Sequence, residues 1–301
     1  MSTPFHDANA KLLILRDLLF EERESPETWE LLCAALDDWP TDDSLPIAFD
    51  YIQSHLDLWP DALRLAPRRW WEVVRGGGDE PRFSLARKLS LAAYGGGAKA
   101  VAALLGEPTM GRLTILDLSH NRLTAAEAVR LARSPHLAGL KDLDLGLNEL
   151  GGKGVAAVVA APWFAGLERL DLTSNQIPNE GLAAFAALGS SGLRSLVLWG
   201  NGIGPMGAQD LASSPGLDGL ERLNLGWNAV GDEGASALLR AGWLAGLSHL
   251  DLSNNKITGE GTRVLVEDQT VWRLPRVDLR GNAVGAELRA LCQRHRPDWL
   301  V

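Results

Sequence analysis

One eleven-residue phrase recurs seven times along the C-terminal two-thirds of this 301-residue chain. Successive copies are 27 residues apart, with a single interval of 26. A fixed period of this length indicates a solenoid, in which each repeat is one structural unit that buries its apolar face against its neighbours. The copies read LTILDLSHNRL from Leu113, LKDLDLGLNEL from Leu140, LERLDLTSNQI from Leu167, LRSLVLWGNGI from Leu193, LERLNLGWNAV from Leu220, LSHLDLSNNKI from Leu247 and LPRVDLRGNAV from Leu274.

Each repeat predicts a short strand followed by a helix. The fourth and sixth residues of the phrase are apolar and lie two apart, so their side chains reach one face of a strand while their neighbours face solvent. After the phrase the period changes. In the stretch GDEGASALLRAG from Gly231, an Asp stands near a helix start, apolar residues follow at helical spacing, and a Gly ends the run.

An asparagine occupies the ninth position of every copy, where the chain turns inward. A buried turn leaves backbone groups that must be paired, and Asn supplies a donor and an acceptor on a short stem. We therefore expect a structural ladder that links successive repeats, formed by Asn121, Asn148, Asn175, Asn201, Asn228, Asn255 and Asn282.

Five repeats also carry a glycine six residues after this asparagine. We expect the helix to press closely against the strand layer there, because a side chain would push the two layers apart. The residues are Gly154, Gly181, Gly207, Gly234 and Gly261.

The pattern LxxLxLxxNxL resembles the leucine-rich-repeat family, and all seven copies match it closely. A strand and a helix in every repeat is similar to the ribonuclease-inhibitor-like subclass, and some bacterial repeat proteins carry a helical N-terminal segment of this general kind. The resemblance implies an α/β fold, a curved horseshoe solenoid with a parallel β-sheet on the concave face and α-helices on the convex face. Curvature follows because helices are about 10 Å wide, whereas strands lie about 4.8 Å apart.

The chain divides near residue 79. Residues 1–79 predict an all-α N-terminal cap domain, and residues 80–301 predict the leucine-rich-repeat domain, with a degenerate first repeat at 86–112, seven clear repeats from residue 113, and the last one capping. In the degenerate copy, Tyr94 stands at the asparagine position. We expect the cap to cover the exposed end of the first repeat. The alternative is that its acidic surface binds a separate partner.

The charge distribution disfavours nucleic acid and anionic membranes as partners. The formal net charge is −9, and residues 1–79 hold 16 acidic and 7 basic side chains, whereas residues 80–301 hold 22 of each. Phosphates favour basic surfaces, and neither part of this chain carries a net positive charge. The sequence contains no apolar stretch long enough to span a bilayer and begins unlike a secretory signal, so we expect a cytoplasmic protein.

The sequence contains no motif of a known catalytic or metal site. The patterns GxxxxGK[ST], HExxH and GxSxG are absent. Cys33 and Cys292 lack metal-ligand spacing and are expected to be small buried hydrophobes. We therefore predict a protein that is not an enzyme, with no catalytic residue, metal or cofactor.

The concave face carries mostly aspartate at the fifth position of the repeat. The residues are Asp117, Asp144, Asp171, Asp251 and Asp278, interrupted by Val197 and Asn224. Carboxylates on neighbouring strands repel each other, and basic third-position residues such as Arg169 and Arg222 offset this. We interpret the row as a solvated ladder rather than as a metal site.

Two tryptophans stand where the aspartates stop, namely Trp199 at the seventh position and Trp227 at the eighth position of the next repeat. Exposed aromatic patches rimmed by charge are typical of interface centres. We therefore predict a partner-binding surface on the concave face. The competing interpretation is that the rings fold over the rim and pack on their own asparagine turns. The predicted surface comprises Val197, Trp199, Asn224, Trp227, Asp171, Arg169, Arg222, Leu147 and Asp251.

The leading hypothesis is a non-catalytic protein–protein interaction module whose concave face binds a protein partner. Proteins similar in architecture activate small GTPases from the repeat rim, which here offers His120, Arg122 and Asn148. A third hypothesis is inhibition of an enzyme by occlusion of its active site, as in the ribonuclease-inhibitor family, from which the small number of cysteines distinguishes this chain. The sequence specifies neither the partner nor an oligomeric state.

Overall fold

Parallel strands in chain order form one open sheet in the computed structural model, which describes residues 4–20, 23–39 and 44–301. Neighbouring strands pair with an offset of 27 residues, except that Arg169 pairs with Ser195 at an offset of 26. The one short interval in the sequence therefore leaves the register intact. The strands within the described residues are β1 (Lys88–Ser90), β2 (Ile115–Asp117), β3 (Asp142–Asp144), β4 (Arg169–Asp171), β5 (Ser195–Val197), β6 (Arg222–Asn224), β7 (His249–Asp251) and β8 (Arg276–Asp278).

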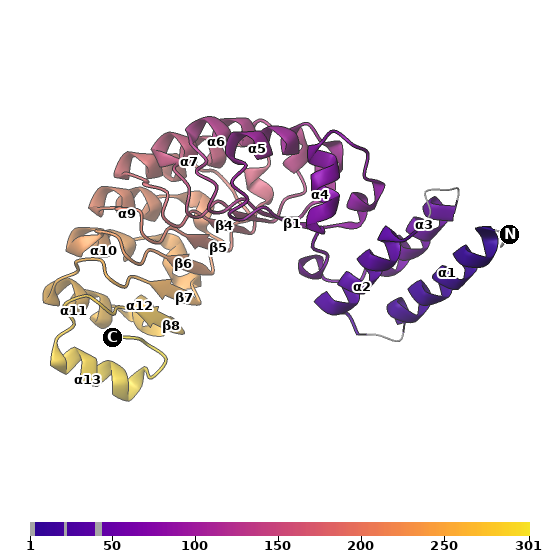
Figure 1. Cartoon of the computed structure of the whole chain (residues 1–301). Helices are drawn as coiled ribbons and strands as arrows, with labels where there is room; N and C mark the ends of the chain where they lie inside the picture. Colours follow the sequence, from indigo (N-terminus) through magenta and orange to yellow (C-terminus); the bar gives the residue numbers. More distant parts are fainter. Residues whose placement is uncertain (1–3, 21–22, 40–43) are drawn as a thin grey trace.

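Helices lie on the outside of the arc and the strands lie on the inside (Figure 1), which confirms the predicted horseshoe. The outer helices are α5 (Gly97–Leu105), α6 (Ala125–Ala132), α7 (Gly151–Val159), α8 (Ala183–Ala186), α9 (Pro205–Ala212), α10 (Gly231–Leu238), α11 (Gly259–Glu267) and α13 (Ala286–His295). The short helix α12 (Gln269–Arg273) lies between α11 and β8. Short 3₁₀ turns also occur, namely η1 (Asp61–Leu63), η2 (Pro81–Leu85), η3 (Pro108–Arg112), η4 (Pro135–Leu137), η5 (Phe164–Gly166), η6 (Asn179–Leu182), η7 (Pro215–Leu217) and η8 (Gly242–Gly246).

The core lies between the strands and the helices. Leu143 and Leu145, the fourth and sixth residues of one repeat, are fully buried, as the two-residue spacing predicts. Burying each such leucine stabilises the fold by roughly 1.5–3 kcal/mol relative to leaving it exposed. Trp163 and Trp243 fill the loops after α7 and α10, and their indole N–H groups donate to backbone carbonyls at 3.1 and 3.2 Å.

The ninth-position asparagines join the backbones of neighbouring repeats. The Oδ1 of Asn148 accepts from the backbone N–H of Asn121 and of Leu123, both at 3.0 Å, and its Nδ2 donates to the carbonyls of Leu118 and Leu145. A bond from the preceding repeat to the side-chain oxygen recurs at Asn121, Asn175, Asn201, Asn228, Asn255 and Asn282. We call this set the asparagine ladder.

The repeated glycines contact the helix of the preceding repeat, so the expected close contact with the strand layer is wrong. A Cβ on Gly181 would lie 2.7 Å from the Cα of Gly152 in α7. A Cβ on Gly234 would lie 3.2 Å from the Cα of Pro205 in α9. Side chains of the same repeat are also near, such as Val230 Cγ1 at 2.7 Å from a Cβ on Gly234, but the close backbone contacts are lateral, to the neighbouring repeat on the convex face.

In the part of the chain that the structure describes, the α-helices that precede the strands are α1 (Pro4–Phe20), α2 (Pro26–Asp37), α3 (Ser44–Leu56) and α4 (Arg68–Arg75). The hydroxyl of Ser25 accepts from the backbone N–H of Thr28 at 3.1 Å and so caps the start of α2. The predicted apolar stripe of α2 is buried, and it comprises Trp29, Leu32, Cys33 and Leu36.

Single bridges cover the two outer strands of the sheet. Leu65 pairs with Lys88 at the β1 edge, and Leu300 pairs with Asp278 at the β8 edge, both in parallel. Open edges invite pairing with other chains, and each bridge covers one residue of its edge strand. The N-terminal segment therefore lies against the first repeat, as expected for a cap. The domain boundary at residue 79 stays a prediction.

Candidate functional site

The polar fifth-position side chains of the concave face, which are all of them except Val197, each accept a backbone hydrogen bond that forms a turn at the end of their strand. The Oδ1 of Asp144 accepts from the backbone N–H of Gly146 at 2.8 Å, and the Oδ1 of Asn224 accepts from that of Gly226 at 2.9 Å. The same bond, to the N–H two residues on, is made by Asp117, Asp171, Asp251 and Asp278. These side chains therefore shape the strand ends, which the interpretation as a solvated ladder missed. The exchange of Asp for Asn at one repeat was the available signal.

Burial and mutual repulsion perturb the first part of this row. Burial raises the pKa of Asp144 to about 6, Asp171 and Asp117 add to the rise, and Arg169 opposes it. Arg169 lies 3.3 Å from a carboxylate oxygen of Asp171 and 3.8 Å from one of Asp142. This third-position cation therefore offsets part of the repulsion, as the sequence predicts.

The row is broken at Val197, and two indole rings occupy the surface beside it. The ring centroids of Trp199 and Trp227 are 5.9 Å apart, with an interplanar angle of 46°. Trp227 is 58% exposed, whereas Trp199 is half-buried. The ring of Trp199 lies over Gly226, where an added Cβ would come within 2.9 Å of the ring atom Cδ1. Gly226 is thus a positioning residue that sequence reasoning did not single out.

The eighth position of every repeat adopts a left-handed backbone conformation. The φ angles fall between 49° and 72° at Ala93, His120, Leu147, Ser174, Gly200, Trp227, Asn254 and Gly281. Only Gly and, less often, Asn adopt this conformation readily. Trp227 and Leu147 therefore combine an unfavourable backbone with apolar side chains that are more than half exposed. The conformation itself serves the fold, because the backbone N–H of Trp227 donates to the carbonyl of Ser253 in the next repeat at 2.8 Å and that of Leu147 donates to Thr173 at 2.7 Å. The large exposed apolar side chains are the feature that the fold does not require.

The structure brings together only part of the predicted partner-binding surface. Asp171, Val197, Asn224 and Asp251 are consecutive in register across β4 to β7, with Trp199 and Trp227 beside them. Arg169 on β4 and Arg222 on β6 lie on either side of Ser195 on β5. Leu147 follows β3, so two repeats separate it from Trp227.

The rim residues offered for a GTPase-directed role do not form one accessible set. Asn148 is buried, and its side chain is committed to the asparagine ladder. His120 and Arg122 are exposed. In the described part of the chain, no group of three or more His, Cys, Asp or Glu side chains could hold a metal ion. None of the helices at residues 4–20, 23–39 and 44–301 has the length and apolar character needed to cross a bilayer.

Comparison with known proteins identifies the repeat. A family model described as Leucine Rich repeat matches residues 139–159, 167–186, 220–239 and 247–266, and a second, Leucine Rich Repeat, matches residues 112–130. No curated protein matches the chain in sequence.

Several solved structures are similar to this chain. A chain of the yeast Rad7 and Elc1 complex is 15% identical, with 86% of this chain and 71% of that chain covered and a TM-score of 0.49. An internalin from Listeria monocytogenes is 20% identical, with 72% and 61% covered and a TM-score of 0.45. A leucine-rich-repeat protein from Leptospira interrogans is also 20% identical, with the same coverage and a TM-score of 0.38. Together, the matched repeats, the in-register parallel strands and the asparagine ladder make this chain a leucine-rich-repeat protein.

Proposed function

We propose that this chain is a non-catalytic module that binds a protein partner on its concave face, with Trp199 and Trp227 at the centre of the contact. The observation that carries the proposal is the pair of indoles at the surface, with centroids 5.9 Å apart on neighbouring repeats, of which Trp227 is exposed and Trp199 is half-buried. Trp227 is a bulky residue at a position where the backbone is left-handed, with a φ of 55°. A bulky residue in that conformation costs on the order of 1 kcal/mol, so a use outside the fold accounts for it better than packing does.

The surroundings of the pair have the composition of an interface centre. Each indole can bury roughly 150–250 Å² on docking. At about 25 cal/mol per Å² of apolar surface, this corresponds to several kcal/mol for the two rings. Arg222 and Asp251 supply a polar rim on one side, and Asp171 supplies it on the other. Apolar centres with charged rims are typical of specific protein interfaces.

We further assign the chain to the ribonuclease-inhibitor-like subclass, because its repeats of 27 residues carry α-helices on the convex face. Occlusion of an enzyme's active site is a special case of the proposed binding. The bacterial type suggested by the helical N-terminal segment remains part of this proposal.

A double substitution tests the binding face with residues that suit the backbone conformation at the two positions. Trp199→Thr and Trp227→Asn install residues that neighbouring repeats already hold at the same positions, namely Thr173 and Asn254. The wild-type chain and the double variant are immobilised, proteins captured from a lysate of the source cells are identified, and the best candidate is purified for titration. We expect the double variant to bind it at least about tenfold more weakly, with a nearly unchanged thermal melt.

Met206→Asn is the matched control, because Met206 is 70% exposed and lies on α9 of the convex face. It should leave binding unchanged. Equal affinities of the wild-type chain and the double variant would refute the proposal. A large loss of stability in the double variant would assign the rings to the core instead.

A further inference from the structure

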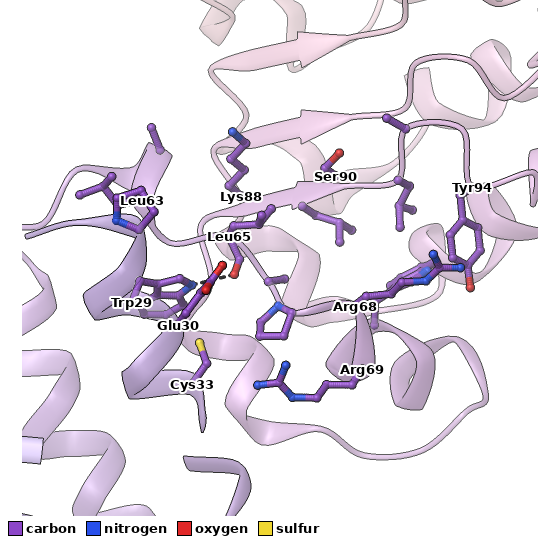
Figure 2. Close-up of a pocket in the computed structure, with 18 of the residues that line it drawn as sticks. Trp29, Glu30, Cys33, Leu63, Leu65, Arg68, Arg69, Lys88, Ser90 and Tyr94 are labelled. Carbon is purple, nitrogen blue, oxygen red and sulfur yellow. Dashed lines mark hydrogen bonds between the residues drawn. The ribbon is translucent and has the colours of Figure 1, made fainter. Parts of the chain in front are cut away.

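A groove of about 610 Å³ lies along the free edge of β1, where the N-terminal helices meet the first repeat. Figure 2 shows Trp29, Glu30 and Cys33 of α2 on one side of it, Arg68 and Arg69 of α4 on another, and Leu65 beside the strand. This volume is within the range of protein ligand sites. The groove is separate from the tryptophan pair, which lies at β5 and β6.

The strand edge in this groove is paired at one residue only. Lys88 donates its N–H to the carbonyl of Arg64 at 3.1 Å and accepts from the N–H of Ala66 at 2.8 Å. The chain then leaves the edge, because Pro67 precedes α4. On the other side of β1, Leu91 donates to Asp117.

Backbone groups alternate along a strand, so the N–H and C=O of Ser90 point to the same side as those of Lys88, into the groove. In the described residues the Leu65 bridge is the sole pairing along this edge. Ser90 and Ala92 line the groove beyond that bridge. An open edge of this kind accepts an extended segment by main-chain hydrogen bonding.

The charges around the groove favour an acidic occupant. The charged side chains lining it are Glu30, Arg68, Arg69 and Lys88, in a region of the chain that is otherwise strongly acidic. Lys88 forms no ion pair within 4.0 Å with any described residue. The guanidinium of Arg68 stacks 4.9 Å from the centroid of the Tyr94 ring, and its Nε lies 3.5 Å from a carboxylate oxygen of Glu72. The Arg68 side chain is 75% exposed, so this surface ion pair leaves its terminal nitrogens open to solvent.

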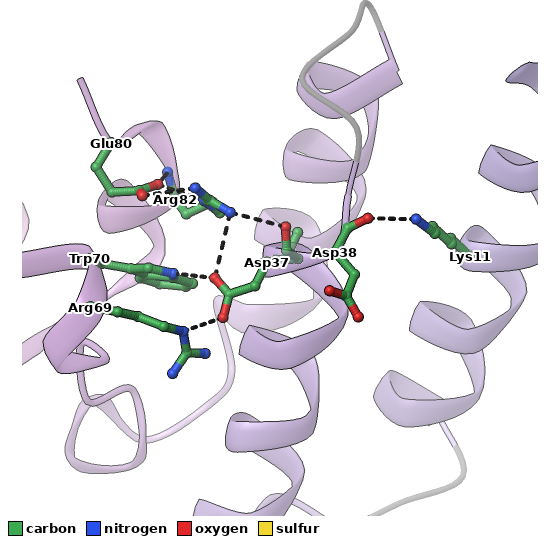
Figure 3. A network of polar contacts seen from close by, with 8 residues as sticks. Lys11, Asp37, Asp38, Arg69, Trp70, Glu80 and Arg82 are labelled. Atoms are coloured by element: carbon green, nitrogen blue, oxygen red, sulfur yellow. Dashed lines mark hydrogen bonds and ion pairs between the residues drawn. The ribbon is translucent and has the colours of Figure 1, made fainter. Parts of the chain in front are cut away.

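The wall that carries Arg69 is held in place by a partly buried network of polar contacts. Asp37 accepts from the indole N–H of Trp70 at 2.7 Å and from the Nε of Arg69 (Figure 3). Arg82 donates to the carbonyl of Leu36 at 3.3 Å and bonds Glu80 at 2.6 Å. Among contacts between described residues, Arg69 donates through its Nε alone, so its two terminal nitrogens keep donors for a carboxylate.

We propose that this groove binds a short acidic segment of a partner protein, which adds as an extended strand along the Ser90 edge of β1 and places its carboxylates near Arg68, Arg69 and Lys88. Main-chain bonds to Ser90 supply the alignment, and the three cations supply the preference for acid. This contact is independent of the tryptophan pair.

Labelled hexapeptides test the proposal on the full chain by fluorescence anisotropy. The acidic probe alternates Glu and Val, and the basic probe alternates Lys and Val. We expect the acidic probe to bind and the basic probe to bind at least about tenfold more weakly, with an affinity for the acidic probe that falls as salt rises. Equal binding of the two probes, or no binding of the acidic one, would overturn the proposal.

Variants locate the site. Arg68→Glu and Lys88→Glu should each weaken the acidic probe about tenfold. Arg289→Glu, an equivalent reversal at an exposed residue of α13, should not weaken it. The double substitution of Trp199 and Trp227 should also bind the probe as the wild type does, so this proposal and the concave-face proposal fail separately. If Arg68→Glu leaves the affinity for the acidic probe unchanged, the assignment of the binding site to this groove is wrong.

Backbone methylation tests the added strand. The acidic probe is methylated on every second backbone nitrogen in each of the two possible phases. Loss of binding in one phase and retention in the other supports pairing with Ser90, whereas equal affinities of the two phases overturn it. A wild-type chain that sediments as a dimer and becomes monomeric on Arg68→Glu would place a second copy in the groove and likewise overturn the proposal.

Discussion

At the residue scale, one side chain can make a hydrogen bond that the fold needs and also carry a charge that destabilises the fold. Asp144 accepts the backbone bond that ends β3, but its carboxylate is partly buried between Asp117 and Asp171. Asn224 makes the equivalent bond without a charge. The fold therefore needs the acceptor at this position and does not need the anion. This separation of roles can be tested with a single substitution.

Asp144→Asn should stabilise the protein at neutral pH. The pKa of Asp144 in the folded chain is about 6 and exceeds its ordinary value of about 4. The wild type therefore gains stability from the protonated form at low pH and loses it as pH rises from about 4 to 6. We expect a gain of about 1 kcal/mol in the variant at pH 7.5, after allowance for solvent screening, and no gain at pH 4.

Urea unfolding at a series of pH values measures this difference. Asp251→Asn is the matched control in β7, where the neighbour in register on one side is the neutral Asn224, and it should give a smaller gain. A loss of stability in Asp144→Asn at pH 7.5 would show that the carboxylate itself is stabilising.

At the element scale, the spacing between repeats depends on glycines that let neighbouring helices touch. Gly181→Ala places a methyl group 2.7 Å from the Cα of Gly152, and backbone atoms cannot move aside as a side chain can. We expect the free energy of unfolding to fall by roughly 1–3 kcal/mol. Chemical denaturation of the purified variant, with an unchanged slope against denaturant, provides the measurement.

Gly242→Ala is the control for this substitution. Gly242 begins η8, is exposed and would have no atom within 4 Å of an added Cβ. It should be neutral or slightly stabilising. If both substitutions cost the same, the loss reflects backbone conformation rather than contact between the helices.

The sequence predicts what its period controls and misses what depends on packing in three dimensions. Leucines two residues apart predicted the strands, and the asparagines predicted the bonds between repeats, because both patterns act locally or at a fixed offset. The direction of the glycine contacts was wrong, since sequence spacing does not reveal which layer a helix approaches. The left-handed backbone at the eighth position was also missed. Gly200 and Asn254 are residue types that favour a positive φ, but Trp227 and Leu147 occupy the same position in other repeats and do not indicate one. The groove at β1 was not predicted, because its lining residues come mainly from α2, α4 and β1, which share no repeated sequence pattern.

At the scale of the whole molecule, a solenoid is as stable as its ends allow. Each repeat contacts only its neighbours, so unfolding can start at an uncovered terminal repeat and spread to the next repeats. At the C-terminal end, Leu279 donates to the carbonyl of Leu300 at 2.7 Å, and Leu300 donates to the carbonyl of Val277 at 2.9 Å. Trp299 is buried, and its indole N–H donates to the carbonyl of Leu274 at 3.1 Å. These few residues therefore close the last repeat.

Deletion of residues 297–301 should loosen the array in a graded manner. The change removes both the Leu300 bridge and the buried Trp299 ring, so amide exchange should accelerate most in β8, less in β7, and little in β5 and beyond. Hydrogen exchange followed by mass spectrometry resolves these strands. Deletion of Val301 alone leaves both contacts in place and serves as the control. Equal acceleration in all strands would mean that the repeats unfold as one cooperative unit, and unchanged exchange in β8 would mean that the C-terminal residues do not hold the last repeat closed.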